Sequence, residues 1–211
     1  AAPGLGARVT GSTPLRMGVF GGAFDPPHRA HQALAQAAVQ QLQLDQLRIV
    51  PTGQAWHKSR SLSAPAHRLA MAQLAFAELP GACIDPRELS RSGPSYTVDT
   101  LAELHAEYPQ AQLFLLMGDD QAQALTTWHR WQDLPRLATI CVAARGYSTG
   151  SGGQFGPNFP SMASLQLLKM PPLDLSATTI RERLACGQDI GTLVSEPVAR
   201  YIADHHLYQT T

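Results

Sequence analysis

The chain has 211 residues, of which 44% are hydrophobic and 15% are charged, and 16 basic and 16 acidic residues give a formal net charge of zero. This length and hydrophobic content suit one domain with a sizeable core. The balanced charge argues against nucleic acid as a partner, and no apolar run is long enough to span a membrane. Three widely spaced cysteines argue against a disulfide framework, and the first sixteen residues lack the apolar core of a signal peptide, so we expect a cytoplasmic protein.

Residues 1–15 are rich in Ala, Gly, Thr and Pro, a composition typical of a flexible extension. We therefore place a single domain at residues 16–211. The sequence does not determine the oligomeric state and is compatible with a homo-oligomer.

Predicted strands and helices alternate along the chain. The strands are expected at 17–20, 47–50, 82–84, 113–117, 138–143 and 165–170. The helices are expected at 30–42, at 65–79 with Leu69, Leu74 and Phe76 facing the core, from about 97 onward, through 125–134, at 176–184 and at 197–206. This order predicts an α/β fold: a doubly wound, Rossmann-like parallel sheet with helices on both faces and a C-terminal helical part. Its ligands should bind beyond the carboxyl ends of the strands.

A glycine turn, Gly-Gly-Ala-Phe-Asp-Pro-Pro-His-Arg-Ala-His at residues 21–31, joins the first predicted strand to the first predicted helix. Glycine lets a ligand approach the backbone closely, and the start of a helix favours a phosphate. His28 and His31 share one helical face, so both can reach the same anion. Asp25 is expected to hold the turn in shape. Half of a metal site, or two incidental surface histidines, are the alternatives for this spacing.

Two polar segments that follow predicted strands are further candidates. Lys58, one of only two lysines in the chain, lies in a polar loop and suits a phosphate as a mobile point charge, although a surface lysine is the alternative. Asp120 follows the strand at 113–117, where a carboxylate can accept from a ribose hydroxyl or favour the start of a helix. A glycine-rich stretch at 146–160 predicts a flexible loop.

The segment Leu-Ser-Ala-Thr-Thr-Ile-Arg at residues 175–181 predicts a second anion site. Hydroxyls at its start cap a helix, and Arg181 projects one turn further on. A planar guanidinium at a helix start suits the outer phosphates of a nucleoside triphosphate. The alternative is a capped helix with a solvated arginine.

The glycine turn resembles the Gly-Gly-Thr-Phe-Asp-Pro-x-His-x-Gly-His signature of the nucleotidyltransferases related to class I aminoacyl-tRNA synthetases, with Ala23 and Ala30 in place of the usual Thr and Gly. Segment 175–181 is similar to the Ile-Ser-Ser-Thr-x-Ile-Arg motif of the same family. The resemblance implies a site for ATP, with Mg²⁺ bound through the ATP phosphates. It implies ATP contacts from Gly21, Gly22, Ala23, Phe24, His31, Gly118, Asp120, Ser176, Thr178 and Arg181. The residues that it implies at the reacting phosphates are His28, His31, Lys58 and Arg181.

Segment 95–101, Ser-Tyr-Thr-Val-Asp-Thr-Leu, together with Trp128, resembles the pyridine pocket of the bacterial nicotinate-nucleotide adenylyltransferases. In this resemblance the Trp128 ring stacks on the pyridinium, and backbone N–H groups near Tyr96 and Thr97 donate to the nicotinate carboxylate. Apart from the resemblance, Trp128 is interpreted as a core or rim aromatic residue. The implied contacts to nicotinate mononucleotide are Lys58, Ser95, Tyr96, Thr97, Trp128 and Arg145.

The resemblance extends over residues 17–208 and implies transfer of AMP from ATP to nicotinate mononucleotide. Two alternatives stay open. One is a related adenylyltransferase that acts on nicotinamide mononucleotide or phosphopantetheine. The other is a catalytically silent regulator that binds nucleotides.

Overall fold

The computed structural model describes residues 13–53, 62–143 and 165–209. Its strands are β1 (Arg16–Gly22), β2 (Gln46–Pro51), β3 (Ala82–Ile84), β4 (Gln112–Gly118), β5 (Thr139–Ala143) and β6 (Leu165–Leu168). Its α-helices are α1 (Arg29–Gln41), α2 (Pro65–Phe76), α3 (Thr97–Glu107), α4 (Asp119–Gln123), α5 (Leu134–Leu137), α6 (Ala177–Ala185) and α7 (Glu196–Asp204). Short 3₁₀ turns are η1 (Arg87–Ser90), η2 (Leu125–Thr127) and η3 (Trp131–Asp133).

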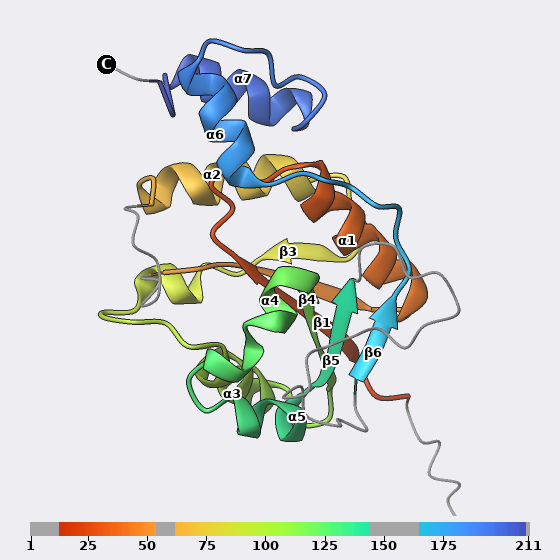
Figure 1. Cartoon of the computed structure of the whole chain (residues 1–211). Helices are drawn as coiled ribbons and strands as arrows, with labels where there is room; N and C mark the ends of the chain where they lie inside the picture. Colours follow the sequence, from red (N-terminus) through yellow and green to blue (C-terminus); the bar gives the residue numbers. More distant parts are fainter. Residues whose placement is uncertain (1–12, 54–61, 144–164, 210–211) are drawn as a thin grey trace, which may run out of the picture.

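The strands form one parallel sheet in the order β3-β2-β1-β4-β5-β6 (Figure 1). The chain runs outward from β1 to β2 and β3, returns to β4 on the other side of β1, and continues to β5 and β6. Because the strand order reverses between β1 and β4, the connections on the two sides diverge and leave space beyond the carboxyl ends of these strands. The predicted doubly wound α/β fold is confirmed.

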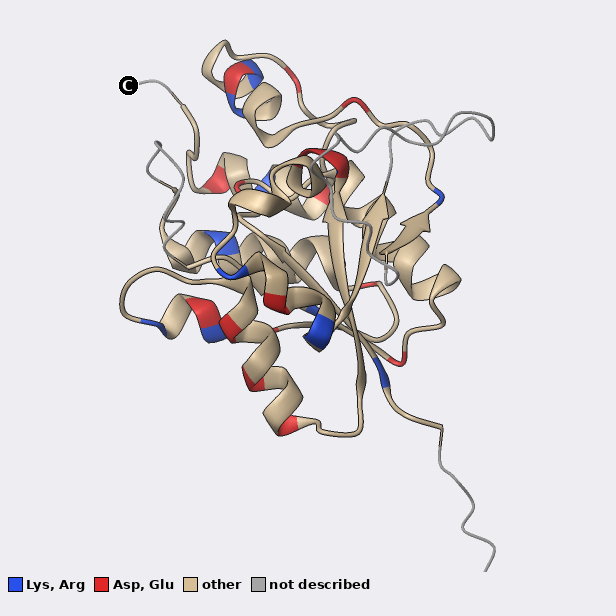
Figure 2. Cartoon of the chain, turned by 60° about the horizontal axis from the view of Figure 1, so that its bottom comes forward, with Lys and Arg blue, Asp and Glu red and all other residues tan. Residues whose placement is uncertain are grey.

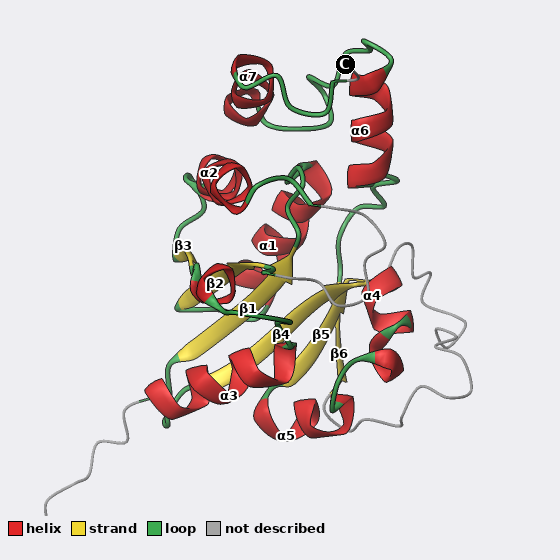
Figure 3. Cartoon of the chain, turned by 90° about the vertical axis from the view of Figure 1, so that its left-hand side faces the viewer, coloured by secondary structure: helices red, strands yellow, loops and turns green. Residues whose placement is uncertain are grey.

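Helices cover both faces of the sheet (Figure 3). The helices α1 and α2 pack on one face with α6 and α7 outside them, and α3, α4 and α5 pack on the other. The side chains of β4 alternate between the two cores, with Phe114 and Leu116 in the first and Leu113, Leu115 and Met117 in the second. A strand buried on both faces explains the continuous apolar run at 113–117.

The buried face of α2 differs from the prediction. Phe76 lies in the core, as expected, but Leu69 is only half-buried and Leu74 is 37% exposed. The rest of the buried face comes from Met71, Ala72 and Ala75, together with an arginine described below. Small alanine side chains let this face of the helix lie close to its neighbours, and Leu74 falls outside the face.

The helix predicted through 125–134 is not continuous. The helix α4 ends at Gln123, and Trp128 follows η2 in an extended conformation. Arg130 then adopts a left-handed conformation with a φ of 50°. A right-handed helix cannot continue through a residue in this conformation. Trp128 therefore lies in a bend between helical turns.

The first strand, β1, begins at Arg16, the residue at which the domain is predicted to start. The preceding residue, Leu15, already packs against the core on the α3 side of the sheet. Basic and acidic residues are interspersed over the described parts of the chain (Figure 2). None of the helices in the described ranges is long and apolar enough to cross a membrane.

Arg68 of α2 is only 2% exposed and joins three connecting segments. Its Nε donates to the Ser63 carbonyl at 3.0 Å, and its Nη1 donates to the carbonyls of Ala23 at 3.1 Å and Thr52 at 2.7 Å. One guanidinium therefore ties the glycine turn to the end of β2 and to the segment before α2.

Replacing this arginine should destabilise the fold strongly. We expect Arg68→Met to lower the free energy of unfolding by about 3 kcal/mol, because buried carbonyls lose their donor. Urea unfolding measures the change, with Leu74→Ala on the exposed side of the same helix as a control that should cost less than about 0.5 kcal/mol. Equal stability of the Arg68→Met protein and the wild type would contradict the role given to Arg68.

Candidate active site at the glycine turn

Two cavities meet above the carboxyl ends of β1 and β4. Their volumes are about 680 Å³ and 290 Å³. Residues that line both cavities are Gly21, Gly22, Ala23, Asp120 and Gln121. The glycine turn therefore lies at the junction of the two cavities. This junction is at the point where the strand order reverses, which is where ligands bind in open α/β sheets.

The larger cavity gathers every residue predicted to contact ATP. Its walls come from the glycine turn, the start of α1, the start of α4 and the segment that leads into α6. The predicted residues among its lining are Gly21, Gly22, Ala23, Phe24, His28, His31, Gly118, Asp120, Ser176, Thr178 and Arg181. Segments separated by up to 160 residues in the sequence therefore converge on one space large enough for a nucleotide.

The smaller cavity gathers the described residues predicted to contact the mononucleotide. Ser95, Tyr96, Thr97 and Trp128 all line it. Tyr96 is the N-cap residue of α3 and Thr97 its first residue, so the N-terminal end of this helix lies at the cavity wall. Lys58, Arg145 and the loop predicted at 146–160 lie outside the described residues.

His28 and His31 form a stacked pair at the start of α1. Their ring centroids are 3.7 Å apart and the ring planes differ by 22°. His28 is the N-cap residue, and its backbone N–H donates to Nδ1 of His31 at 3.1 Å. Because Nδ1 of His31 accepts this bond, the proton of the neutral ring is on Nε2, which makes that atom a hydrogen-bond donor. Phe24 packs edge-on against the His31 ring with centroids 5.1 Å apart.

Arg181 is held in the wall of the larger cavity by two hydrogen bonds. Its Nη1 donates to the main-chain carbonyl of Asp25 at 2.8 Å, and its Nη2 donates to the Thr178 hydroxyl at 3.0 Å. Ser176 caps α6 by accepting from the Thr179 N–H at 3.1 Å, as the sequence predicted for this hydroxyl segment. A guanidinium and a helix start thus face the same space, an arrangement that favours phosphate groups.

Asp120 lies where the two cavities join, in the first turn of α4. An acidic residue at this position also stabilises the helix start, so both roles predicted for Asp120 fit its place. Among residues 13–53, 62–143 and 165–209, no group of three or more His, Cys, Asp or Glu is arranged to hold a metal ion.

Comparison with known proteins decides the family. The model of the cytidylyltransferase-like family matches residues 19–183. A probable nicotinate-nucleotide adenylyltransferase from Albidiferax ferrireducens is 61% identical over 195 residues, which cover 92% of this chain and 98% of that protein. The chain belongs to the cytidylyltransferase-like family, among its nicotinate-nucleotide adenylyltransferases.

A second member of this family, a probable nicotinate-nucleotide adenylyltransferase from Methylibium petroleiphilum, is 42% identical over 207 residues, with 95% of each chain covered. The fold also matches the Plasmodium falciparum nicotinic acid mononucleotide adenylyltransferase complexed with NaAD. That structure has a TM-score of 0.74 and 20% identity, covering 92% of this chain and 97% of that one.

Three residues of the smaller cavity, Glu88, Thr100 and His129, were not singled out in the sequence. The His129 ring lies against the Tyr96 ring, with centroids 4.2 Å apart and the ring planes tilted by 30°. Glu88 and Thr100 are buried. The Thr100 hydroxyl donates to the Glu88 carboxylate at 2.7 Å. Glu88 and His129 belong to no recognisable local motif, whereas Thr100 falls inside segment 95–101.

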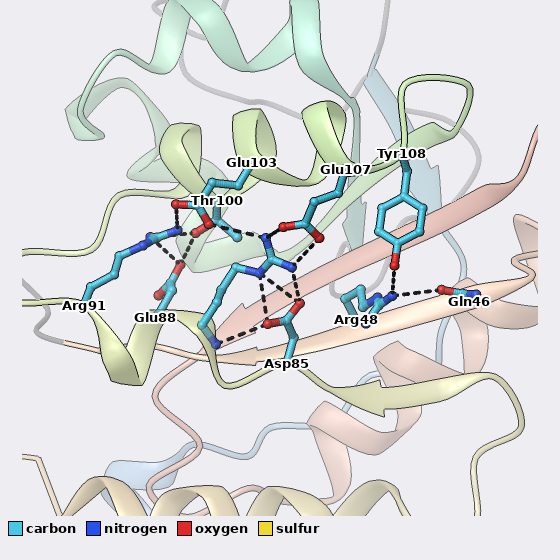
Figure 4. A network of polar contacts seen from close by, with 10 residues as sticks. Gln46, Arg48, Asp85, Glu88, Arg91, Thr100, Glu103, Glu107 and Tyr108 are labelled. Atoms are coloured by element: carbon cyan, nitrogen blue, oxygen red, sulfur yellow. Dashed lines mark hydrogen bonds and ion pairs between the residues drawn. The ribbon is translucent and has the colours of Figure 1, made fainter.

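Glu88 lies at the inner end of a polar network that ties η1 to α3 (Figure 4). Arg91 donates to the Thr100 hydroxyl at 2.9 Å and pairs with Glu103 at 2.8 Å. At the outer end Arg87 bonds to Asp85 at 2.9 Å and to Glu107 at 2.9 Å. This network fixes α3, whose N-terminal end lines the smaller cavity.

Gly53, two residues after the end of β2, is packed against the main chain of Glu88. A Cβ atom at this position would lie 2.2 Å from the Glu88 main-chain oxygen and 2.8 Å from the Ser95 hydroxyl. The Ser95 hydroxyl donates to that oxygen at 3.4 Å. Only glycine permits this close approach of the end of β2 to the wall of the smaller cavity.

The titration of Glu88 should be visible in the stability of the protein. Burial raises the pKa of Glu88 above its ordinary value of 4.5, while the Thr100 hydrogen bond and Arg91 oppose this rise and Glu103 adds to it. The folded protein therefore keeps the proton at pH values where the unfolded chain has lost it. The stabilising contribution of Glu88 is complete below the unfolded-state pKa and declines as pH rises through the folded-state pKa.

We therefore expect the stability of the wild type, measured relative to Glu88→Gln, to fall as pH rises above about 4.5, by at most about 1.4 kcal/mol per pH unit. Denaturant unfolding across pH 4 to 8 measures this difference. Glu107→Gln, which removes an exposed, ion-paired carboxylate from the outer end of the same network, is measured beside it as the control for loss of a network carboxylate. A difference that is constant with pH would refute the shifted titration.

Proposed function

We propose that this chain transfers the adenylyl group of ATP to nicotinate mononucleotide, forming nicotinate adenine dinucleotide and pyrophosphate. The observation that carries the proposal is the meeting of two cavities at Gly21 and Gly22, with the predicted ATP residues in one and the predicted mononucleotide residues in the other. The names of its close relatives support the same reaction. Each cavity has the chemistry of the ligand proposed for it.

The larger cavity suits the triphosphate and adenosine of ATP. Arg181 and the start of α6 would bind the outer phosphates, and the stacked histidines would donate to the α-phosphate and to the departing oxygen. Asp120 would face the adenosine side, where a carboxylate can accept from a ribose hydroxyl. Lys58, which lies outside the described residues, is proposed to contact the attacking phosphate or the α-phosphate.

The smaller cavity suits the pyridine ring of the mononucleotide. Trp128 would stack on the electron-poor ring, and the N-terminal end of α3 near Tyr96 and Thr97 would favour the carboxylate. Ser95 completes this wall, and Arg145 is proposed as a further contact to the carboxylate or phosphate.

The reaction requires one in-line displacement. A phosphate oxygen of the mononucleotide attacks the α-phosphorus, the bond from that phosphorus to the bridging oxygen breaks, and pyrophosphate leaves with the electron pair. No covalent enzyme intermediate is needed, so the protein acts by aligning the reactants and by neutralising charge on the reacting oxygens. The glycine turn, which lines both cavities, is where we place the α-phosphate.

The residues of the larger cavity fit an ion bound through ATP rather than one bound by the protein alone. The described carboxylates in its lining are Asp25, Asp119 and Asp120. The Asp25 carboxylate is buried and accepts from protein donors, whereas Asp120 is exposed to solvent. Mg²⁺ prefers oxygen ligands and keeps several waters. Held by the triphosphate, it would neutralise phosphate charge.

We also propose that residues 16–211 act as one domain in the cytoplasm. Cys83, Cys141 and Cys186 are all free, which suits a reducing compartment.

A product assay tests the function and its closest alternatives. With ATP and Mg²⁺, we expect dinucleotide and pyrophosphate from nicotinate mononucleotide, with kcat/KM roughly fivefold to thirtyfold above that for nicotinamide mononucleotide, because the helix end favours a carboxylate. Equal or reversed preference would argue for the amide substrate, and use of phosphopantetheine would identify the other alternative. Absence of pyrophosphate with all three would identify a silent regulator.

The stacked histidines should be needed for turnover. We expect His31→Ala to lower kcat by about 10²- to 10³-fold, the usual cost of one transition-state donor, with the fold retained. His67→Ala is the matched control, because His67 lies on α2 and contacts Tyr201 outside both cavities. Steady-state kinetics with circular dichroism distinguish the two, and a near wild-type kcat for His31→Ala would rule out its proposed role.

A further inference from the structure

The C-terminal segment reaches back to the wall of the larger cavity. The Tyr208 hydroxyl donates to the Asp25 carboxylate at 2.5 Å, across 183 residues of sequence. Asp25, within the glycine turn, is 1% exposed and lines the larger cavity. Burial, together with this hydrogen bond, raises the pKa of Tyr208 far above its ordinary value, so the hydroxyl stays protonated and keeps donating.

Asp25 connects this tail to two other segments. Its other carboxylate oxygen accepts from the Ser63 N–H at 3.0 Å, and its main-chain carbonyl accepts from Arg181 at 2.8 Å. One buried residue thereby joins the segment before α2, the helix α6 and the tail after α7. The guanidinium that it holds is the one proposed to bind the outer phosphates.

A second contact ties the same two regions. The N–H of Arg29, the first residue of α1, donates to the Leu193 carbonyl at 2.9 Å. Leu193 and Leu207 both pack against the first core. The helices α6 and α7 lie on the outer side of α1 and α2 (Figure 1, Figure 3). The glycine turn is therefore fastened to the C-terminal part at Asp25 and again at Arg29.

We propose that Tyr208 is a positioning residue for ATP: its hydroxyl fixes Asp25, and the Asp25 carbonyl in turn fixes Arg181 in the wall of the larger cavity. The proposal rests on the proposed function only in taking ATP as the ligand of that cavity. Without the hydroxyl, a buried carboxylate loses a donor, Asp25 shifts, and Arg181 must be ordered when the phosphates bind.

Thermodynamic linkage requires the converse effect. If docking of the tail strengthens ATP binding, ATP must stabilise the docked tail by the same factor. A purely structural role, in which Tyr208 only fastens the C-terminal helices, predicts no such coupling.

Tyr201→Phe provides a matched control for Tyr208→Phe. The Tyr201 hydroxyl also fastens the C-terminal part, through His67 Nδ1 at 2.9 Å. Its partner His67 lines neither cavity, whereas Asp25, the partner of Tyr208, lines the larger one. Both variants remove one hydroxyl that joins this part to the body of the protein. Only one of these hydroxyls leads to Arg181.

The first measurement is the dissociation constant of ATP with Mg²⁺, by calorimetry without mononucleotide, for the wild type and both variants. We expect Tyr208→Phe to weaken ATP binding about tenfold and Tyr201→Phe less than about twofold, since a hydrogen bond to a buried carboxylate is worth that much. The KM for nicotinate mononucleotide should change less than about twofold in both. Equal effects of the two variants on ATP, or equal effects of Tyr208→Phe on both substrates, would overturn the proposal.

The second measurement needs only the wild type and so does not depend on the folding of a variant. Amide hydrogen exchange in residues 196–209 should slow when ATP and Mg²⁺ are added, and unchanged exchange would overturn the proposal. If the wild type binds ATP but forms no dinucleotide, the proposed function fails while both measurements still test Tyr208. If the wild type does not bind ATP, both fail.

Discussion

The reversal of strand order between β1 and β4 is the constraint on which the site depends. Strands on the two sides of this point connect through helices that leave in diverging directions, so the described connections leave space beyond the carboxyl ends of β1 and β4. The chain fills this edge with a glycine turn whose backbone lines a cavity on each side. A reaction between two nucleotides needs such a place, because the two reacting phosphorus-bound groups must approach the same stretch of backbone from opposite directions.

Buried charged residues hold the walls of both cavities. Arg68 joins the glycine turn to the end of β2, Asp25 joins it to α6 and to the C-terminal tail, and Glu88 lies against the end of β2 and the first turn of α3. Each makes hydrogen bonds to groups that are distant in the sequence. A buried charge with satisfied partners contributes more to a defined geometry than to net stability, and a defined geometry is what alignment of two substrates requires.

The parts of the fold that were predictable are those determined by neighbouring residues. The apolar run in β4 and the glycine turn are local patterns, so the alternation of strands and helices followed from sequence alone. The residues predicted for ATP converge in one cavity because each follows a strand or begins a helix, and parallel strands bring all such positions to one edge. The broken helix near Trp128 was not predictable, because Arg130 adopts its left-handed conformation without a glycine to mark it.

What the sequence did not reveal depends on contacts between distant segments. Glu88 and Arg68 look like ordinary charged residues in a loop and a helix, and only the packing of other elements around them makes them buried. Tyr208 lies near the end of the chain, 183 residues from its partner. The wrong prediction that Leu74 is buried has the same cause. The buried face of α2 is determined by the elements that it packs against rather than by its most hydrophobic residue.

The most direct measurement of the central claim is a crystal structure of the protein with nicotinate adenine dinucleotide and Mg²⁺. The account predicts the pyrophosphate above Gly21 and Gly22, the adenosine in the larger cavity and the pyridine ring against Trp128 in the smaller one. A dinucleotide that lies entirely within one cavity, or a pyrophosphate away from the glycine turn, would contradict the account.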